Sequence, residues 1–168
     1  MTSETETSSI EREIFTWEDF GQAARELAQM IADSGWIPEV VIAVARGGLI
    51  PAGALSYALG TKVCGSLNVE FYSDVAQTLP EPVVLPPLLD TTALEGRRVL
   101  IADDVADSGK TLQLTVALLE DTGAEVRTAT IYAKPTTVFE PEYVLRHTGK
   151  WITFPWSAQK PVTGRYGE

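Results

Sequence analysis

Two apolar runs, each followed by a glycine-containing turn and a helix-like segment, constrain the fold of this chain more than any other feature. The first run, EVVIAVA at 39–45, is continuous and rich in β-branched residues, which is typical of a strand buried on both faces. It leads through Arg-Gly-Gly into LIPAGALSYALG at 49–60 and then into a second predicted strand at 62–70. A strand, a helix and a following strand form a βαβ unit, so we expect an α/β fold with a parallel sheet.

The same order of elements returns later in the chain. RRVLIAD at 97–103 predicts a strand, TLQLTVALLEDTG at 111–123 a helix, and EVRTATIYA at 125–133 another strand. Near the N-terminus, helical spacing of apolar residues after the cap-like Thr16 predicts an amphipathic helix that stops at Gly35. We therefore expect a single domain with an open, mainly parallel sheet flanked by helices.

Three segments depart from this pattern. Residues 1–13 are acidic and rich in Ser and Thr, and we expect a flexible tail there, which leaves 14–168 as one domain. Residues 71–97 contain four prolines and little periodicity, so we expect a mobile lid or insert with room for a short hairpin. Residues 134–168 are expected to supply a last strand and a loop that form a small hood over the site.

The composition of the chain limits the classes of partner that it is expected to bind. The formal net charge is −10, which argues against a surface that grips nucleic acid through clustered Lys and Arg. No stretch approaches the ~20 apolar residues that span a bilayer, so no membrane partner is expected. The single cysteine, Cys64, cannot form an internal disulfide, which favours a reducing compartment such as the cytoplasm, and we expect it to be buried. A small phosphorylated ligand stays compatible, because its site needs only local donors.

The stretch VLIADDVADSGKTL, residues 99–112, holds the clearest chemistry. It runs from a buried strand into a helix, the edge where open α/β sheets bind ligands. A nucleotide P-loop would need a glycine five residues before Gly109, where this chain has Asp104. The helix start instead offers backbone N–H groups and hydroxyls to a single phosphate. The residues that offer them are Ser108, Gly109, Lys110 and Thr111.

The adjacent carboxylates of Asp103 and Asp104 need a different role. Helix capping explains one aspartate, but not two neighbouring ones behind a buried strand. Paired carboxylates can accept hydrogen bonds from the two vicinal hydroxyls of a ribose. Mg²⁺ would relieve their repulsion, since it prefers oxygen ligands together with substrate phosphates. We predict a ribose-5-phosphate site, with Asp107 as a spare acid near the sugar.

These residues resemble the signature of type I phosphoribosyltransferases, which bind 5-phosphoribosyl-1-pyrophosphate (PRPP). The resemblance implies that Asp103 and Asp104 hold the ribose hydroxyls, that 107–111 cradle the 5′-phosphate, and that Asp107 is the general base. It implies Mg²⁺ as cofactor, with Asp104 reaching it through substrate or water. The turn VARGGLIPA then resembles the pyrophosphate loop of the family, in which Arg46 pairs with pyrophosphate oxygens and Gly47 allows close backbone approach. Taken alone, that turn also suits a solvated arginine.

The acceptor base is predicted from the segments AKP and WITFPW. Lys134 ends a predicted strand and can donate to a carbonyl oxygen, Trp151 can stack on a planar base, and Ile152 offers backbone groups. The plain alternatives are a solvated lysine and a tryptophan in the core. Together the segments resemble the 6-oxopurine branch of the family, the xanthine–guanine and hypoxanthine–guanine enzymes. The resemblance implies that Lys134 binds O6 and that the Ile152 carbonyl meets a 2-amino group.

Alternatives remain open at this point. The chain could be a PRPP-binding regulator without turnover, or transfer to adenine, orotate or uracil. From Phe71 to Gly96 it has no Lys or Arg, although related lids often carry one, and Arg165 is a remote candidate for pyrophosphate. We expect a purine-salvage enzyme that is a homodimer or homotetramer. The sequence does not rank hypoxanthine, guanine and xanthine.

Overall fold

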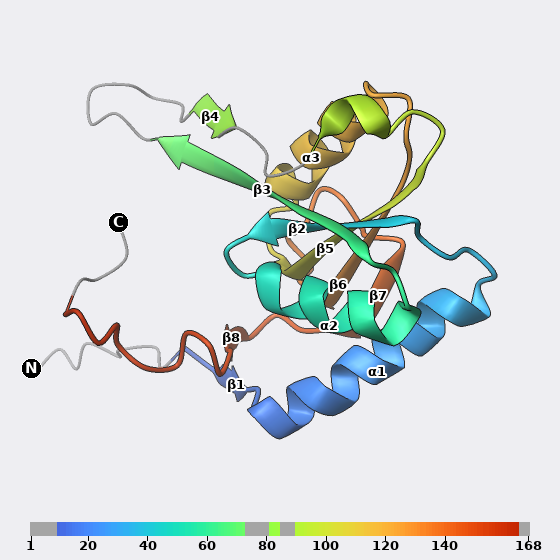
Figure 1. Cartoon of the computed structure of the whole chain (residues 1–168). Helices are drawn as coiled ribbons and strands as arrows, with labels where there is room; N and C mark the ends of the chain where they lie inside the picture. The colour runs from blue at the N-terminus through green and yellow to red at the C-terminus, as the bar shows by residue number, and fades with distance from the viewer. Residues whose placement is uncertain (1–9, 73–80, 85–89, 165–168) are drawn as a thin grey trace, which may run out of the picture.

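The computed structural model describes residues 10–72, 81–84 and 90–164 (Figure 1). The helices are α1 (Trp17–Asp33), α2 (Leu49–Leu59) and α3 (Lys110–Glu120), with a short 3-10 helix η1 (Thr91–Ala93). The strands are β1 (Arg12–Ile14), β2 (Val40–Ala45), β3 (Val63–Tyr72), β4 (Glu81–Val84), β5 (Arg98–Ala106), β6 (Glu125–Ala133), β7 (Tyr143–His147) and β8 (Trp151–Thr153).

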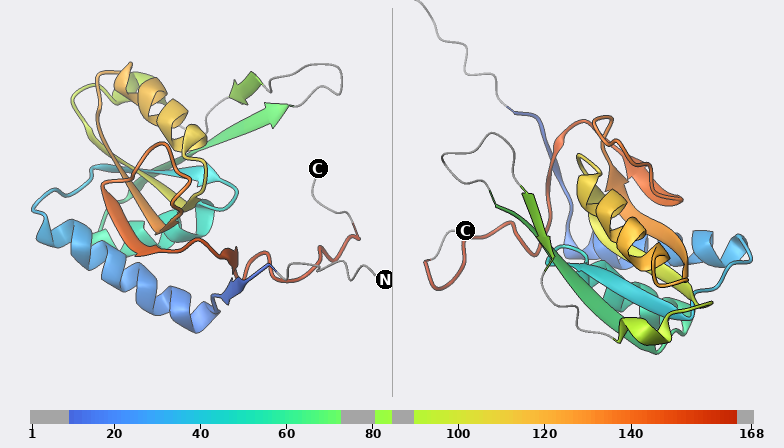
Figure 2. Two further views of the ribbon diagram at one scale, coloured as in Figure 1. Left: turned by 180° about the vertical axis from the view of Figure 1, so that it is seen from behind. Right: turned by 90° about the horizontal axis from the view of Figure 1, so that it is seen from above.

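A six-stranded sheet forms the centre of the molecule, in the order β4-β3-β2-β5-β6-β7. Its strands are parallel except β4, which runs antiparallel to β3. Helices α1 and α2 cover one face, and α3 covers the other (Figures 1 and 2). The expected α/β fold with a mainly parallel sheet is therefore confirmed.

Alternation along the strands produces these two layers. In β2, Val41 and Ala43 face α1 and α2, while Ile42 faces α3. Both faces are therefore apolar, and the strand is a continuous apolar run rather than an alternating one. The parallel order brings the carboxyl ends of β2, β5 and β6 to one edge of the sheet.

The helix boundaries follow the predicted signals in two of three cases. Thr16 caps α1 in a capping box with Asp19, and α2 ends at Gly60 in the left-handed conformation. The third prediction was too long: α3 ends at Glu120 instead of reaching Gly123. Residues 121–123 form turns that lead into β6.

The hood differs from the prediction in its composition. Strand β8 pairs in parallel with β1, and the two form a separate two-stranded sheet. Arg12 and Glu13, which we expected in the flexible tail, thus belong to a strand of the hood. Strand β7 joins the edge of the main sheet beside β6, and it was not foreseen within 134–168.

Two further expectations concern β3 and the segment after it. Cys64 is exposed, contrary to expectation, because it lies at the start of β3, where β4 does not pair with it. No hairpin lies wholly inside the described part of 71–97: this segment contributes β4, which pairs with the end of β3, a strand that begins at Val63. Leu94 is buried against the main sheet, so the end of 71–97 is core and not lid. The residues at 73–80 and 85–89, and Arg165, lie outside the described residues.

Among the residues that the structure describes, no helix has the length and apolar character to cross a membrane.

Candidate active site

Three cavities adjoin one another at the carboxyl ends of β2, β5 and β6. The Gly109 cavity, about 90 Å³, is lined by the loop between β5 and α3. The Trp151 cavity, about 360 Å³, lies between β5, β6 and the hood, and the Arg46 groove, about 980 Å³, lies between the turn after β2 and the segment after β8. Asp107 lines both the Gly109 and the Trp151 cavities, and Asp104 lines both the Trp151 cavity and the Arg46 groove. One stretch of chain therefore joins all three.

The Gly109 cavity has the form of an anion cradle at the start of α3. Gly109 has φ +79°, and a Cβ there would collide with the Thr137 hydroxyl and lie 2.8 Å from the Phe139 nitrogen. Ser108 is held from the same side, since the Val138 N–H donates to its carbonyl at 2.8 Å. Glycine is thus the residue that lets the turn close against 136–139. Ser108 and Thr111 line the cavity, while the exposed Lys110 side chain does not.

The two adjacent acids lie inside β5, three residues or fewer before its end, and not in the loop after it. The Asp103 carboxylate accepts from the Asp104 N–H at 2.8 Å, and the Asp104 carboxylate from the Val105 N–H at 2.8 Å. Burial raises the pKa of Asp103 well above its usual range, and the charge of Asp104 adds to the rise. Burial likewise raises the pKa of Asp104, against hydrogen bonds that include the Trp156 side chain.

The turn after β2 lies directly against this acid pair. A Cβ on Gly47 would collide with the Asp104 carboxylate, and one on Gly48 with the Ala102 carbonyl of β5. The peptide bond between Ala45 and Arg46 is cis. Arg46 is exposed and lines the groove, so the structure brings it to the same edge as Asp104. This proximity depends on glycine at 47 and 48.

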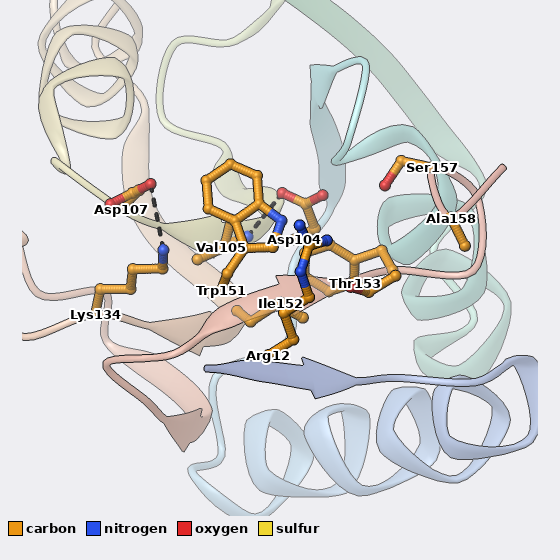
Figure 3. A pocket seen from close by; sticks show the side chains of 11 residues that line it. Arg12, Asp104, Val105, Asp107, Lys134, Trp151, Ile152, Thr153, Ser157 and Ala158 are labelled. Carbon is orange, nitrogen blue, oxygen red and sulfur yellow. Dashed lines mark hydrogen bonds and ion pairs between the residues drawn. The ribbon is translucent and has the colours of Figure 1, made fainter. Parts of the chain in front are cut away.

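The Trp151 cavity gathers the predicted base-binding residues (Figure 3). The Lys134 Nζ lies 3.6 Å from Asp107 Oδ2 and 5.2 Å from the centroid of the Trp151 ring. The Lys134 side chain is only 14% exposed, whereas Trp151 is 54% exposed. Trp151 is therefore not a core residue, and Lys134 is not a solvated one. Ile152 is buried under the cavity and lines it.

Sequence reasoning missed two side chains of this region. Arg12 of β1 lines the Trp151 cavity, and Trp156 lines the Arg46 groove together with Asp104, where it lowers the pKa of that carboxyl. Trp156 belongs to the segment that was singled out, yet its link to Asp104 requires the fold. Arg12 had no signal, because it stands in a short segment without periodicity.

The acid pair fits a divalent cation held jointly with a substrate. Within the described ranges, no group of three or more His, Cys, Asp and Glu residues is placed to hold a metal. Two carboxylates whose charge is opposed by burial would gain from a cation, and substrate phosphates would complete its oxygen shell. Asp104 is the acid that lies between the groove and the Trp151 cavity.

Comparisons with known proteins agree with this geometry. The family profile described as "Phosphoribosyl transferase domain" matches residues 11–160. Xanthine-guanine phosphoribosyltransferase of Gluconobacter oxydans (strain 621H) is 33% identical over 93% of this chain and 90% of its own. The enzyme of the same name from Idiomarina loihiensis is 33% identical over 92% of this chain and 95% of its own. The crystal structure of purine phosphoribosyltransferase from Pyrococcus horikoshii Ot3 is 37% identical, covers 91% of this chain and 97% of its own, and superposes with a TM-score of 0.79.

Proposed function

The chain belongs to the phosphoribosyl transferase family, and we propose that it transfers the 5-phosphoribosyl group of PRPP to a 6-oxopurine base in purine salvage. The products are the nucleoside 5′-monophosphate and pyrophosphate. One observation supports this above all others: Asp104 and Asp107 each line two adjoining cavities, so a sugar between them reaches all three.

The sugar and its phosphate take the parts of the site nearest β5. Asp103 and Asp104 accept hydrogen bonds from the two ribose hydroxyls. The 5′-phosphate lies in the Gly109 cavity, against the backbone N–H groups of residues 107–111 and the hydroxyls of Ser108 and Thr111. Burial removes water from the two carboxylates and raises their pKa values. When the sugar binds, its hydroxyls donate hydrogen bonds that offset this loss of hydration.

The pyrophosphate and the base lie on opposite sides of the ribose. The pyrophosphate extends into the Arg46 groove, where the Arg46 guanidinium and the Gly47 N–H donate to it. The base enters the Trp151 cavity and stacks on the indole, and Lys134 donates to the oxygen at position 6. Because the ring of Trp151 is exposed to solvent, a planar base can stack on it and cover it.

Asp107 is the general base of the proposed reaction. A ring nitrogen of the purine attacks C1 of the ribose, the bond from C1 to the pyrophosphate oxygen breaks, and the proton of that nitrogen passes to the Asp107 carboxylate. Lys134 lies 3.6 Å from this carboxylate and helps to hold it in place. Arg46 and the loop N–H groups stabilise the charge that grows on the leaving pyrophosphate. Mg²⁺, when bound beside Asp104, neutralises part of the same charge.

A panel of bases tests the proposal. The protein is incubated with PRPP, Mg²⁺ and, in turn, hypoxanthine, guanine, xanthine, adenine, orotate and uracil, and pyrophosphate is measured. We expect equal amounts of pyrophosphate and nucleotide with 6-oxopurines and none with the other three bases. Turnover confined to those three contradicts the assigned base. PRPP binding without turnover of any base favours a regulator instead.

Two properties remain predictions of the family resemblance. We propose a homodimer or homotetramer in the cytoplasm. Light scattering after size-exclusion chromatography measures the mass against the 18.2 kDa of one chain, and fractionation of cells locates the protein.

A further inference from the structure

An arginine from the N-terminal strand shares the Trp151 cavity with the proposed base-binding residues. Figure 3 shows the Arg12 side chain directed from β1 into the cavity, near Ile152 and Thr153. Lys134 and Asp107 lie on the other side of Trp151 in that view. The cavity thus has a cationic side chain toward each end.

The position of Arg12 is set by the packing of β1. Arg12 pairs in register with Trp151, and the strand continues on both sides: the Trp151 N–H donates to the Glu11 carbonyl at 3.1 Å, and the Phe15 N–H to the Thr153 carbonyl at 3.0 Å. The next residue of the strand, Glu13, accepts from the Tyr132 hydroxyl at 2.7 Å.

These contacts tie Arg12 to the strand that supports Lys134. Tyr132 lies on β6, two residues before Lys134. Its ring packs edge-on against the buried Phe15, with 5.6 Å between the two ring centroids. The backbone of Arg12 is therefore anchored to the same core as Lys134. The exposed Arg12 side chain therefore reaches the cavity from a fixed position on β1.

The two cations of the cavity differ in their partners. Lys134 has Asp107 within 3.6 Å. For Arg12, no carboxylate of the described chain lies within ion-pair distance of the guanidinium. A guanidinium has five N–H donors in a planar fork and no acceptor, so it matches an oxygen and opposes an amino group.

We propose that Arg12 is a specificity-determining residue, which donates to the purine edge opposite Lys134 and favours a 2,6-dioxopurine over a 2-amino-6-oxopurine. The inference rests on the proposed function. With O6 at Lys134, position 2 of the base faces β8 and its partner β1, where Arg12 pairs with Trp151. The Ile152 carbonyl can still accept from a 2-amino group, so Arg12 shifts the preference and does not create it alone. The guanidinium of Arg12 and a 2-amino group are both hydrogen-bond donors, so Arg12 disfavours a base that carries a 2-amino group.

The test is the ratio of kcat/KM for xanthine to kcat/KM for hypoxanthine. Hypoxanthine has no group at position 2, so it reports on fold and chemistry alone. Arg12→Met removes the donors and keeps the apolar stem. We expect its ratio to fall about tenfold to a hundredfold through a higher KM for xanthine, as for a lost charge-assisted hydrogen bond. The value of kcat/KM for guanine should stay level or rise up to about threefold, because the donor that opposes its 2-amino group is gone. Arg25→Met, on the exposed side of α1, should change nothing.

Each outcome supports or contradicts the proposed role of Arg12. Should Arg12→Met fail to fold, Arg12→Lys keeps the charge without the fork, and we expect an intermediate ratio. An unchanged ratio in the folded variants, or wild-type protein that uses guanine and hypoxanthine but not xanthine, overturns the role of Arg12 and leaves the proposed function intact. Wild-type protein that uses no purine overturns both.

Discussion

The phosphate end and the base end of the proposed site are assembled in different ways. Asp103, Asp104 and the phosphate cradle come from one continuous stretch, 103–111, on one strand and the start of one helix, and residues 136–139 pack against its turn. The base end takes Lys134, Trp151 and Arg12 from three segments that are far apart in the chain. The residues of the first end are therefore placed mainly by local geometry, whereas those of the second depend on how the hood packs.

The largest effect is expected where the two ends meet, at Asp107. Asp107→Asn retains the shape but cannot take the purine proton, so we expect kcat to fall about a hundredfold to ten-thousandfold. PRPP affinity should change little. Steady-state kinetics with hypoxanthine checks this, with Asp121→Asn, an exposed acid after α3, as the matched control. Unchanged turnover in Asp107→Asn would show that another group is the base.

A change at the phosphate end should damage both binding and folding. Gly109→Ala places a Cβ at φ +79° against Thr137 and Phe139. We expect a loss of about 1–3 kcal/mol in the free energy of unfolding, and a KM for PRPP raised at least tenfold. Gly53→Ala is the control, because Gly53 lies within α2 with free space around it, and alanine there should stabilise by about 0.5–1 kcal/mol. Equal urea midpoints for the two variants would contradict the cradle.

A change at the base end should leave the phosphate end intact. Trp151→Ala removes the stacking surface, so we expect the KM for hypoxanthine to rise about tenfold to a hundredfold. PRPP affinity, measured by calorimetry, should stay within about twofold of the wild type. Tyr57→Ala removes an exposed aromatic ring from α2 and should affect neither value. A parallel loss of PRPP affinity would mean that the two ends are not separable.

The smallest effect is on stability, and its size depends on pH. Burial raises the pKa of Asp103, so between its ordinary value and the raised one the folded protein binds more protons than the unfolded chain. The wild type without ligand therefore gains stability as the pH falls through the raised pKa. Asp103→Asn carries no charge, and we expect it to be about 0.5–2 kcal/mol more stable than the wild type at pH 7.

Thermal unfolding at pH 7 and at pH 4 measures this difference. The advantage of Asp103→Asn should shrink at pH 4, and PRPP binding should be weakened at pH 7. An Asn variant less stable than the wild type at pH 7 would mean that the carboxylate contributes to the fold, and would contradict a raised pKa of Asp103. Asp121→Asn again serves as the control for a lost exposed acid.

The contrast between the phosphate end and the base end of the site also explains which features could be predicted from the sequence. The strand and helix around 99–112 were predicted because an apolar run, adjacent acids and Ser-Gly-Lys-Thr stand together, and each has one plausible local structure. The capping box of Thr16 was found for the same reason. Lys134 and Trp151 were found through the resemblance, and their 5.2 Å approach follows from the fold.

What was missed depends on pairing between distant segments. Strand β1 has three residues, too few for any period, and its partner β8 lies near the other end of the chain. Arg12 therefore looked like part of a tail. The burial of Leu94 was missed in a proline-rich setting, and the early end of α3 at Glu120 was missed because Gly123 looked like its stop.

The pairing of β1 with β8 has a consequence for protein synthesis. Arg12 leaves the ribosome before any strand of the main sheet, but its register partner, Trp151, follows only after the whole main sheet. Because a domain folds as a unit, the hood can close only after Trp151 has emerged, when the residues of β2, β5 and the turn at Gly109 are already outside the ribosome. A nascent chain thus exposes every residue of its sugar-phosphate site before it can assemble its base site, which requires β1 to pair with β8.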